Sequence, residues 1–321
     1  MTGEDSPVVD LELLRASARG FLAERGEKES VEDLAAMDWT GLLVDESAGG
    51  AGWRPVEACV VAEELGRALD RSAWLGTAVA AAAVASASDG EAHRWLPDLL
   101  SGAATAGVVI GGAARVPRGD EIDILIMLSD TGIRLIEAAA VGKRWFDDDL
   151  LDVTRPVWRF DIRDVGGVTI GAPERSAQLA DMARLLVTAD SLGAVSMTLS
   201  RLTEYLKERR AFGAPIASFQ AVQHRLVDLL VFEVKARAIV MKAARAVAAG
   251  SDQAPALAAT AHAFVAQKGV AAVDECMQLS GGIGFTWEYP LHHELRRVFA
   301  NSHLFGTARS SRTHLAKVCG W

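Results

Sequence analysis

Cysteine is scarce in this chain of 321 residues, which carries three, at positions 59, 276 and 319. The three are widely spaced, odd in number and free of any CxxC pair. A disulfide framework needs paired cysteines, and a zinc site needs closely spaced ligands, so neither is predicted. We therefore expect reduced thiols, no metal site and a cytoplasmic protein.

A surplus of basic residues is also absent, because 33 Lys and Arg face 42 Asp and Glu. Nucleic-acid-binding proteins usually carry a basic surplus, which argues against that class of partner. The first ten residues are acidic and lack the basic-then-apolar layout of a secretion signal. The apolar run at residues 76–87 is too short to cross a bilayer. We expect neither a nucleic acid nor a membrane as partner.

Half of the chain is hydrophobic, enough for a large core and for two or three domains. The spacing of the apolar residues divides the sequence into a helical part at 1–102, a small β domain at 103–172 and a helical bundle at 173–321. The first part is expected to hold helices at residues 9–24, 56–69, 74–86 and 91–100.

The middle of the chain changes to short β-rich runs separated by Gly, Asp and Pro. Strands are expected at residues 106–110, 122–128, 132–137, 157–162 and 167–170. Long apolar helices follow, expected at residues 177–209, 218–249, 255–279, 291–302 and 307–318. The fold class predicted is mainly α with a small central β domain. Helices this apolar predict a bundle whose outer faces are covered by other subunits.

Two motifs at expected helix ends have both a structural and a functional interpretation. Gly281, Gly282 and Gly284 lie between two helices, where glycine often ends a helix. The same glycines would also let the backbone approach a phosphate or ribose, because they have no Cβ. Arg209 and Arg210 either lie at a helix end in solvent, where the helix dipole favours cations, or donate paired hydrogen bonds to a diphosphate.

The wider surroundings of these motifs favour the functional interpretation. Residues 208–213 (ERRAFG), 219–220 (FQ) and 281–290 (GGIGFTWEYP), followed by Gly306 and Thr307, resemble the C-terminal domain of the acyl-CoA dehydrogenase family. Residues 37–44 and 61–67 resemble the N-terminal helical domain of that family, and residues 151–155 are similar to the end of its β domain. The resemblance implies a helical domain, a β domain and a C-terminal four-helix bundle.

The resemblance also implies FAD as cofactor, shared with a neighbouring subunit. By that resemblance Arg209 would pair with the pyrophosphate. Phe212, Gln220 and Gln278 would touch the adenosine end, beside the loop that contains Gly281 and Gly282. These residues would grip the cofactor without taking part in redox chemistry.

The catalytic base of the family is missing. The position before the Gly-Thr pair is usually the glutamate that removes the α-proton of the substrate, and here it is Phe305. Some members place that glutamate on the long helix leading to Arg209, where this chain has Ala183. Neither a phenyl ring nor a methyl group accepts a proton.

Two flavin-ring segments of the family's β domain, one like Thr-Glu-Pro-Gly-Ala-Gly-Ser and one like Trp-Ile-Thr-Asn, are also absent. Trp145 and Thr154 do not lie in comparable surroundings, and Trp145 is interpreted as a core or interface residue. Five further groups were weighed as a substitute base. They are Glu288, interpreted as a structural acceptor, together with Glu294, His292, His293 and His303, which form no metal or dyad pattern.

A retained cofactor grip without a base resembles the short, degenerate subunits of heterotetrameric acyl-CoA dehydrogenases from steroid- and cholesterol-degrading actinobacteria. That resemblance implies an α2β2 assembly whose full-length partner supplies the glutamate, the flavin-ring pocket and the thioester site. It also implies a bulky, steroid-derived CoA thioester and an electron-transferring flavoprotein as acceptor. The alternatives are a structural or regulatory subunit that binds no FAD, and a flavin monooxygenase of the same fold.

Overall fold

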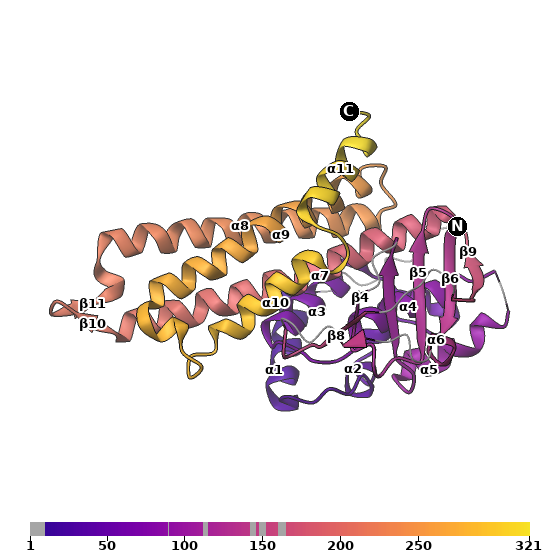
Figure 1. The fold of residues 1–321 in the computed structure, drawn as a ribbon, viewed down its shortest axis with the longest axis horizontal. Coiled ribbons are helices and arrows are strands. Elements are labelled where there is room, and N and C mark those ends of the chain that lie inside the picture. The colour runs from indigo at the N-terminus through magenta and orange to yellow at the C-terminus, as the bar shows by residue number, and fades with distance from the viewer. Residues whose placement is uncertain (1–9, 89, 112–114, 142–145, 148–151, 160–164) are drawn as a thin grey trace.

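The protein was analysed as a computed structural model that describes residues 10–88, 90–111, 115–141, 146–147, 152–159 and 165–321. Its architecture is mainly helical with a small sheet at one end, which confirms the predicted fold class (Figure 1). The N-terminal part contains α1 (Leu11–Arg25), α2 (Glu32–Ala35), α3 (Pro55–Arg67), α4 (Trp74–Ala85) and α5 (Leu96–Ser101).

The boundaries of these helices follow local chemistry. The side chain of Asp10 accepts hydrogen bonds from the backbone of Glu12 and Leu13 and so caps α1. Pro55 occupies the first turn of α3, where its missing N–H costs nothing. The helix expected at residues 91–100 is split, because a 3₁₀ turn at Ala92–Trp95 precedes α5.

The sheet region consists of two small sheets. The larger has the strand order β3 (Ala106–Ile110), β5 (Ile124–Ser129), β6 (Gly132–Glu137), β9 (Val168–Gly171), with only the β3–β5 pair parallel. The smaller has the order β4 (Arg115–Pro117), β8 (Val157–Arg159), β7 (Phe146–Asp147). Strands were expected near all of these except β4 and β7, which are very short. Part of the run expected at 157–162 lies outside the described residues, as does Trp145.

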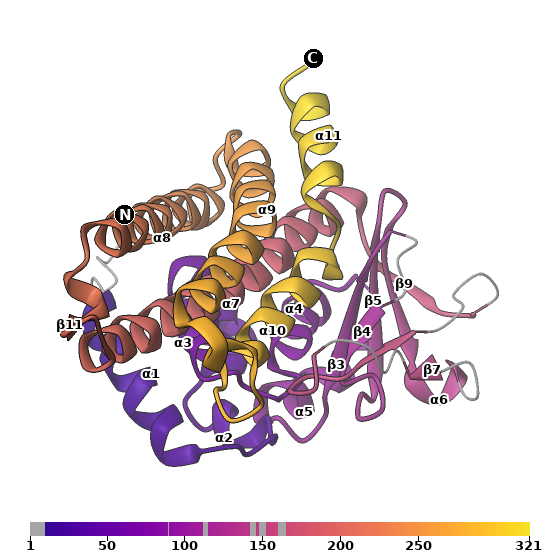
Figure 2. The same ribbon diagram turned by 60° about the vertical axis from the view of Figure 1, so that its left-hand side comes forward.

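The C-terminal part is a bundle of α7 (Pro173–Glu208), α8 (Gln220–Ala248), α9 (Ala254–Ser280) and α10 (Leu291–Leu304), followed by α11 (Ala308–Val318). The 36 residues of α7 join the two ends of the molecule, since this helix packs on both the sheet and the bundle (Figure 2). Its many buried residues explain the near-continuous apolar sequence.

One helical stretch of the described chain, Ala254–Phe285, is long and apolar enough to cross a membrane by length and composition alone. Half of its most apolar window is buried inside the protein. It contains α9, which packs against α7, α8, α10 and α11 and so has the surroundings of a core helix. The shorter apolar run noted in the sequence is α4, which is buried over most of its length.

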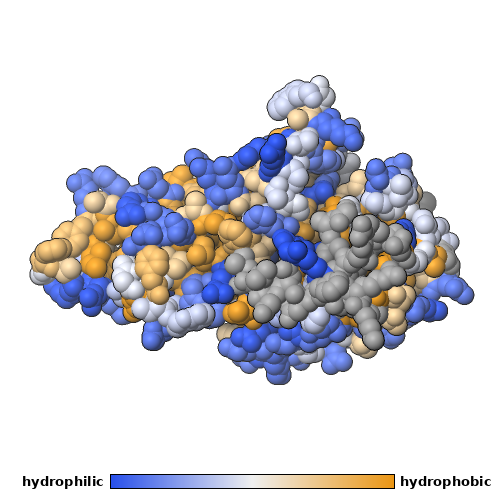
Figure 3. All heavy atoms as spheres, in the orientation of Figure 1, coloured by the Kyte–Doolittle hydropathy of each residue, from blue (hydrophilic) through white to orange (hydrophobic). Residues whose placement is uncertain are grey.

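The outer side of the bundle exposes apolar side chains. Four of them lie on α8 with 43–56% of their surface exposed: Val227, Leu230, Val231 and Val234. In the space-filling view, apolar residues interrupt the polar surface over the half of the molecule that the bundle forms (Figure 3). Such a surface is typical of a chain that associates with another.

Candidate functional site

The tip of the bundle brings together the two segments predicted to grip a cofactor. Arg209 follows the last residue of α7, and Gln220 is the first residue of α8. Gln278 lies in the last turn of α9, and Gly281 and Gly282 begin the 3₁₀ turn after it. Both segments lie at the end of the bundle farthest from the sheet (Figure 1). All five residues are exposed to solvent.

Contacts made by two tyrosines connect these two segments. The rings of Tyr205 on α7 and Tyr289 beyond the 3₁₀ turn lie 5.6 Å apart between centroids. The hydroxyl of Tyr289 also donates to the carbonyl oxygen of Arg201 at 3.5 Å. The loop after α9 is therefore attached to the body of the bundle.

Phe212 projects from the tip on a tight hairpin. The strands β10 (Arg210–Ala211) and β11 (Ala214–Pro215) are joined by two residues, Phe212 and Gly213, with φ of 53° and 80°. A two-residue turn of this kind needs positive φ at both positions. For a residue with a side chain that conformation costs about 1–2 kcal/mol. The ring is nevertheless 98% exposed, which favours contact with another molecule.

The groups at the tip fit the adenosine diphosphate end of FAD. The Arg209 side chain has no hydrogen bond or ion pair within the described part of the chain, so its planar fork is free to bind a diphosphate. Gln220 and Gln278 offer amide donors and acceptors. Gly281 has a φ of 66°, and a Cβ on Gly282 would meet nothing within 4 Å in this chain. The exposed backbone there is open to a ligand.

The two positions at which the resemblance predicts a base lie inside the apolar core. Phe305 directly follows α10 with 4% of its surface exposed, and Ala183 in α7 is fully buried. The guanidinium of Arg184 donates to the carbonyl oxygen of Phe305 at 3.3 Å and so joins the two segments. Both positions belong to one hydrophobic cluster, which explains how an apolar ring is accommodated.

The space next to Phe305 is almost filled. A crevice lined by Phe305, Arg155, Gly76 and Gly107, among others, has a volume of about 10 Å³. A single water molecule needs at least about 10–15 Å³ on the same basis. The crevice therefore has no room for an acyl chain or a flavin ring in this conformation.

A buried ionic network lies beside this crevice. Arg297 of α10 is fully enclosed, and its Nε donates to Asp152 at 2.5 Å while Nη1 pairs with Asp190 at 3.3 Å. Its Nη2 donates to the hydroxyl of Thr154 at 2.6 Å and to the carbonyl oxygen of Asp70 at 2.8 Å. Thr154 is thus part of an ionic network.

The same network uses the remaining acceptors of its aspartates. Arg155 pairs with Asp190 at 3.4 Å, and the amide of Asn301 donates to Asp190 at 2.5 Å. Burial opposes ionisation of Asp152, but the guanidinium groups of Arg297 and Arg155 outweigh it and lower the pKa of that carboxyl. Carboxylates held in this way are poor proton acceptors, so the network does not replace the missing base.

None of the five groups weighed as a substitute base lines the crevice beside Phe305. Glu288 and His303 are exposed, and His303 stacks on Phe299 at 5.1 Å. Glu294 is fully buried, pairs with Arg201, and has its pKa raised by burial. His292 and His293 are half-buried and lie with their rings 4.0 Å apart.

Among the described residues no group of three or more His, Cys, Asp or Glu side chains could hold a metal ion. Two features of the structure are not predicted by the sequence motifs, namely the Arg297 network and a cavity lined by arginines between α1 and α7. Both are assembled from residues far apart in the chain, and no local spacing indicates them.

Two family models match the sequence. Residues 10–103 match "Acyl-CoA dehydrogenase, N-terminal domain", and residues 175–320 match "Acyl-CoA dehydrogenase, C-terminal domain". Acyl-CoA dehydrogenase IpdE2 of Mycobacterium tuberculosis is 33% identical over 304 residues, which cover 92% of this chain and 88% of that protein.

Solved structures share the fold at lower identity. The "Tcur3481-Tcur3483 steroid ACAD G363A variant" superposes with a TM-score of 0.84 at 24% identity, covering 97% of this chain and 98% of that one. The ChsE4-ChsE5 complex from Mycobacterium tuberculosis gives a TM-score of 0.82 at 20% identity, covering 99% of each chain.

Proposed function

Because this chain belongs to the acyl-CoA dehydrogenase family, we propose that it is the base-lacking subunit of a heteromeric, FAD-dependent acyl-CoA dehydrogenase. One observation carries the proposal. The tip of the bundle exposes groups that suit the tail of FAD, while the buried ring of Phe305 stands where the resemblance predicts the catalytic glutamate. A full-length partner would supply the glutamate, the flavin-ring pocket and the thioester site in an α2β2 assembly.

Bound FAD would supply the acceptor for the hydride that leaves the β-carbon of the thioester. The contribution of this chain is to hold the other end of the cofactor. Arg209 would donate to the pyrophosphate, and Gln220 and Gln278 would bind the adenosine end beside Gly281. Phe212, already in solvent, would contribute apolar contact at the same end.

The substrate proposed is a bulky, steroid-derived CoA thioester, with an electron-transferring flavoprotein as acceptor. Two similarities support this choice. A structural neighbour is named as a steroid enzyme, and two neighbours are named as pairs of different chains. The nearly filled crevice beside Phe305 is consistent with substrate binding on the partner.

That filled crevice also supports a second candidate function, a structural subunit that binds no FAD. The open tip separates the two candidates, since a purely structural chain has no need of an unpaired Arg209 next to a strained, exposed Phe212. The same experiment tests both.

The experiment is native mass spectrometry of this chain alone and co-expressed with a full-length acyl-CoA dehydrogenase as the proposed partner. We expect two FAD per α2β2 assembly and no FAD on the lone chain. A homo-oligomer of this chain that carries FAD by itself would overturn the proposal.

The variant Arg209→Ala tests, in the same assembly, whether Arg209 binds the pyrophosphate of FAD. Hydrogen bonds to charged groups contribute about 1.5–3 kcal/mol, so FAD should bind roughly 10- to 100-fold more weakly. Lys207→Ala removes a positive charge two residues earlier in the chain and should leave FAD affinity unchanged, because Lys207 already pairs with Glu204 at the surface. If Arg209→Ala retains full FAD affinity, the structural subunit becomes the better interpretation.

A further inference from the structure

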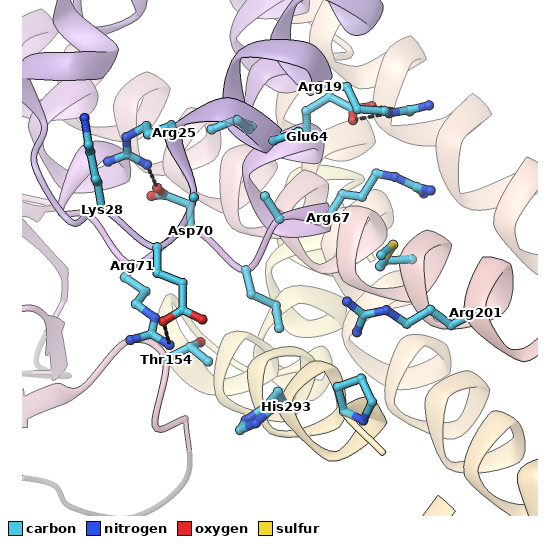
Figure 4. A pocket seen from close by; sticks show the side chains of 18 residues that line it. Arg19, Arg25, Lys28, Glu64, Arg67, Asp70, Arg71, Thr154, Arg201 and His293 are labelled. Atoms are coloured by element: carbon cyan, nitrogen blue, oxygen red, sulfur yellow. Dashed lines mark hydrogen bonds and ion pairs between the residues drawn. The ribbon is translucent and has the colours of Figure 1, made fainter. Parts of the chain in front are cut away.

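A second cavity opens between the N-terminal helices and the bundle, away from both Phe305 and the tip (Figure 4). It has a volume of about 580 Å³ and is bounded by α1, the end of α3 with the loop after it, α7 and the start of α10. That volume lies within the range of about 300–1,000 Å³ typical of small-molecule sites.

The lining of this cavity carries an excess of positive charge. Three carboxylates line it, namely those of Glu27, Glu64 and Asp70. Six permanently cationic side chains line it as well: Arg19, Arg25, Lys28, Arg67, Arg71 and Arg201. A concave wall of one sign concentrates the field and attracts small anions.

The three carboxylates are already engaged by other cations of the lining. Asp70 pairs with Arg25 at 2.5 Å, Glu64 with Arg19 at 2.9 Å, and Glu27 with Arg71 at 3.0 Å. Arg201 forms an ion pair with Glu294, which is not one of the residues that line the cavity. These pairs leave no carboxylate of the lining for Arg67.

Arg67 is the arginine of this lining that forms no ion pair within the described chain. Its guanidinium donates to the hydroxyls of Ser196 at 3.1 Å and Ser200 at 3.4 Å. Burial, and next the charge of Arg19, lower the pKa of Arg67, and the carboxylates of Glu64, Glu233 and Glu63 only partly oppose that shift. In Figure 4, Arg67 lies between Glu64 and Arg201, and its side chain runs in the opposite direction to that of Arg201. An anion placed there would restore the charge balance.

Apolar side chains complete the lining, among them Leu22, Leu69, Met197 and Pro290. A planar guanidinium binds a carboxylate or phosphate through two parallel hydrogen bonds, and an apolar wall favours a hydrocarbon body. We propose that this cavity binds a small organic anion, with its carboxylate or phosphate group on Arg67 and its apolar body against Leu69 and Met197. None of these residues belongs to the proposed FAD grip, so the site is separate from it.

Isothermal titration calorimetry on this chain, purified in complex with the proposed partner, tests the proposal. Hexyl phosphate and hexanoate are the probes, because they present the two anionic groups on the same hydrocarbon body, and hexanol is the neutral control. We expect saturable binding of one or both anions and none of hexanol. The tighter of the two anions identifies the group that the site prefers.

Two variants locate the binding. Arg67→Gln should weaken the preferred anion at least tenfold, whereas Arg94→Gln, which removes an exposed arginine outside the cavity, should change nothing. Met197→Phe keeps every charge and fills the apolar wall, so it should also weaken binding, even if Arg67→Gln fails to fold. Absence of saturable binding by the complex overturns the proposal, as does equal affinity in Met197→Phe and the native protein. Binding by the lone chain but not by the complex would mean that the partner occupies the cavity, and would overturn it too.

Discussion

Arg297 is a fully enclosed charge in the described chain, with none of its surface exposed. Replacing it by Met would leave Asp152 and Asp190 buried with fewer counter-charges. Breaking a buried ion pair by removing one partner costs about 3–5 kcal/mol. We expect Arg297→Met to lower the free energy of unfolding by that amount in urea titrations. Arg94→Met, at an exposed pair, should cost less than about 1 kcal/mol, and an equal loss in both variants would contradict this role.

His262 is a buried histidine that should make stability depend on pH. Burial, and next the charge of Arg184, lower its pKa to about 4 from 6.5. The unfolded chain therefore takes up the proton near pH 6.5, while the folded protein resists it until about pH 4. The contribution to stability is complete above pH 6.5 and is lost as the pH falls toward 4, by up to roughly 3 kcal/mol.

The pH effect can be assigned by comparing unfolding free energies between pH 7 and 4. His262→Gln should flatten the dependence in that window, because the group that protonates on unfolding is gone. His303→Gln, at an exposed histidine, should retain the native slope. Identical slopes in all three proteins would show that other groups cause the dependence.

At the scale of elements, α3 and α7 touch backbone to backbone through two glycines. A Cβ on Gly193 would lie 1.8 Å from the carbonyl oxygen of Glu63, and one on Gly66 would lie 1.9 Å from that of Asp190. Neither backbone oxygen can move without separating the helices. The crossing therefore holds the N-terminal helices against the bundle and sets the position of Asp190 in the ionic network.

Gly193→Ala should force this crossing apart and reduce the free energy of unfolding by about 3 kcal/mol or more, at the upper end of overpacking costs. Gly20→Ala is the matched control, since it lies in α1 and its Cβ would meet nothing within 4 Å. That control should stabilise by about 0.5–1 kcal/mol through helix propensity. Thermal unfolding monitored by circular dichroism distinguishes the two. A small decrease in the free energy of unfolding of Gly193→Ala would mean that α3 and α7 can shift apart at little cost.

Much of the element layout could be predicted from the sequence, because apolar spacing reports directly on which face of a helix is buried. The long helices and the β3, β5, β6 and β9 strands follow from such local patterns. The pairing of β4 with β8 could not be predicted, since three-residue strands about forty positions apart carry no periodic signal. The domain boundaries after residues 102 and 172 remain predictions.

The candidate site divides in the same way. The tip residues belong to contiguous motifs and could be identified in the sequence, and their roles remain predictions. The Arg297 network could not, because Asp152, Asp190 and Arg297 are more than thirty residues apart, and a charged residue in sequence is usually a surface residue. The cationic cavity could not be predicted for the same reason, because its lining residues come from both ends of the chain.

At the scale of the whole molecule, the exposed apolar residues of α8 point to association. Leu230 is 50% exposed among three exposed valines of the same helix. A charge there would have to be buried unpaired in an interface, which costs several kcal/mol. We expect Leu230→Glu to shift the assembly toward smaller species in analytical ultracentrifugation. Leu13→Glu, at a 67% exposed leucine on α1, should leave the assembly intact. Unchanged sedimentation of Leu230→Glu would place the interface elsewhere.

The hairpin that carries Phe212 has a consequence for how fast the chain would associate with the proposed partner. Its backbone is already fixed in the left-handed conformation by a two-residue turn, and its ring already stands in solvent. The hairpin is therefore already ordered before association, so binding does not have to include the entropic cost of ordering it. Binding should then need no prior folding of the tip, so that collision and orientation, and not a slow conformational step, limit the association rate.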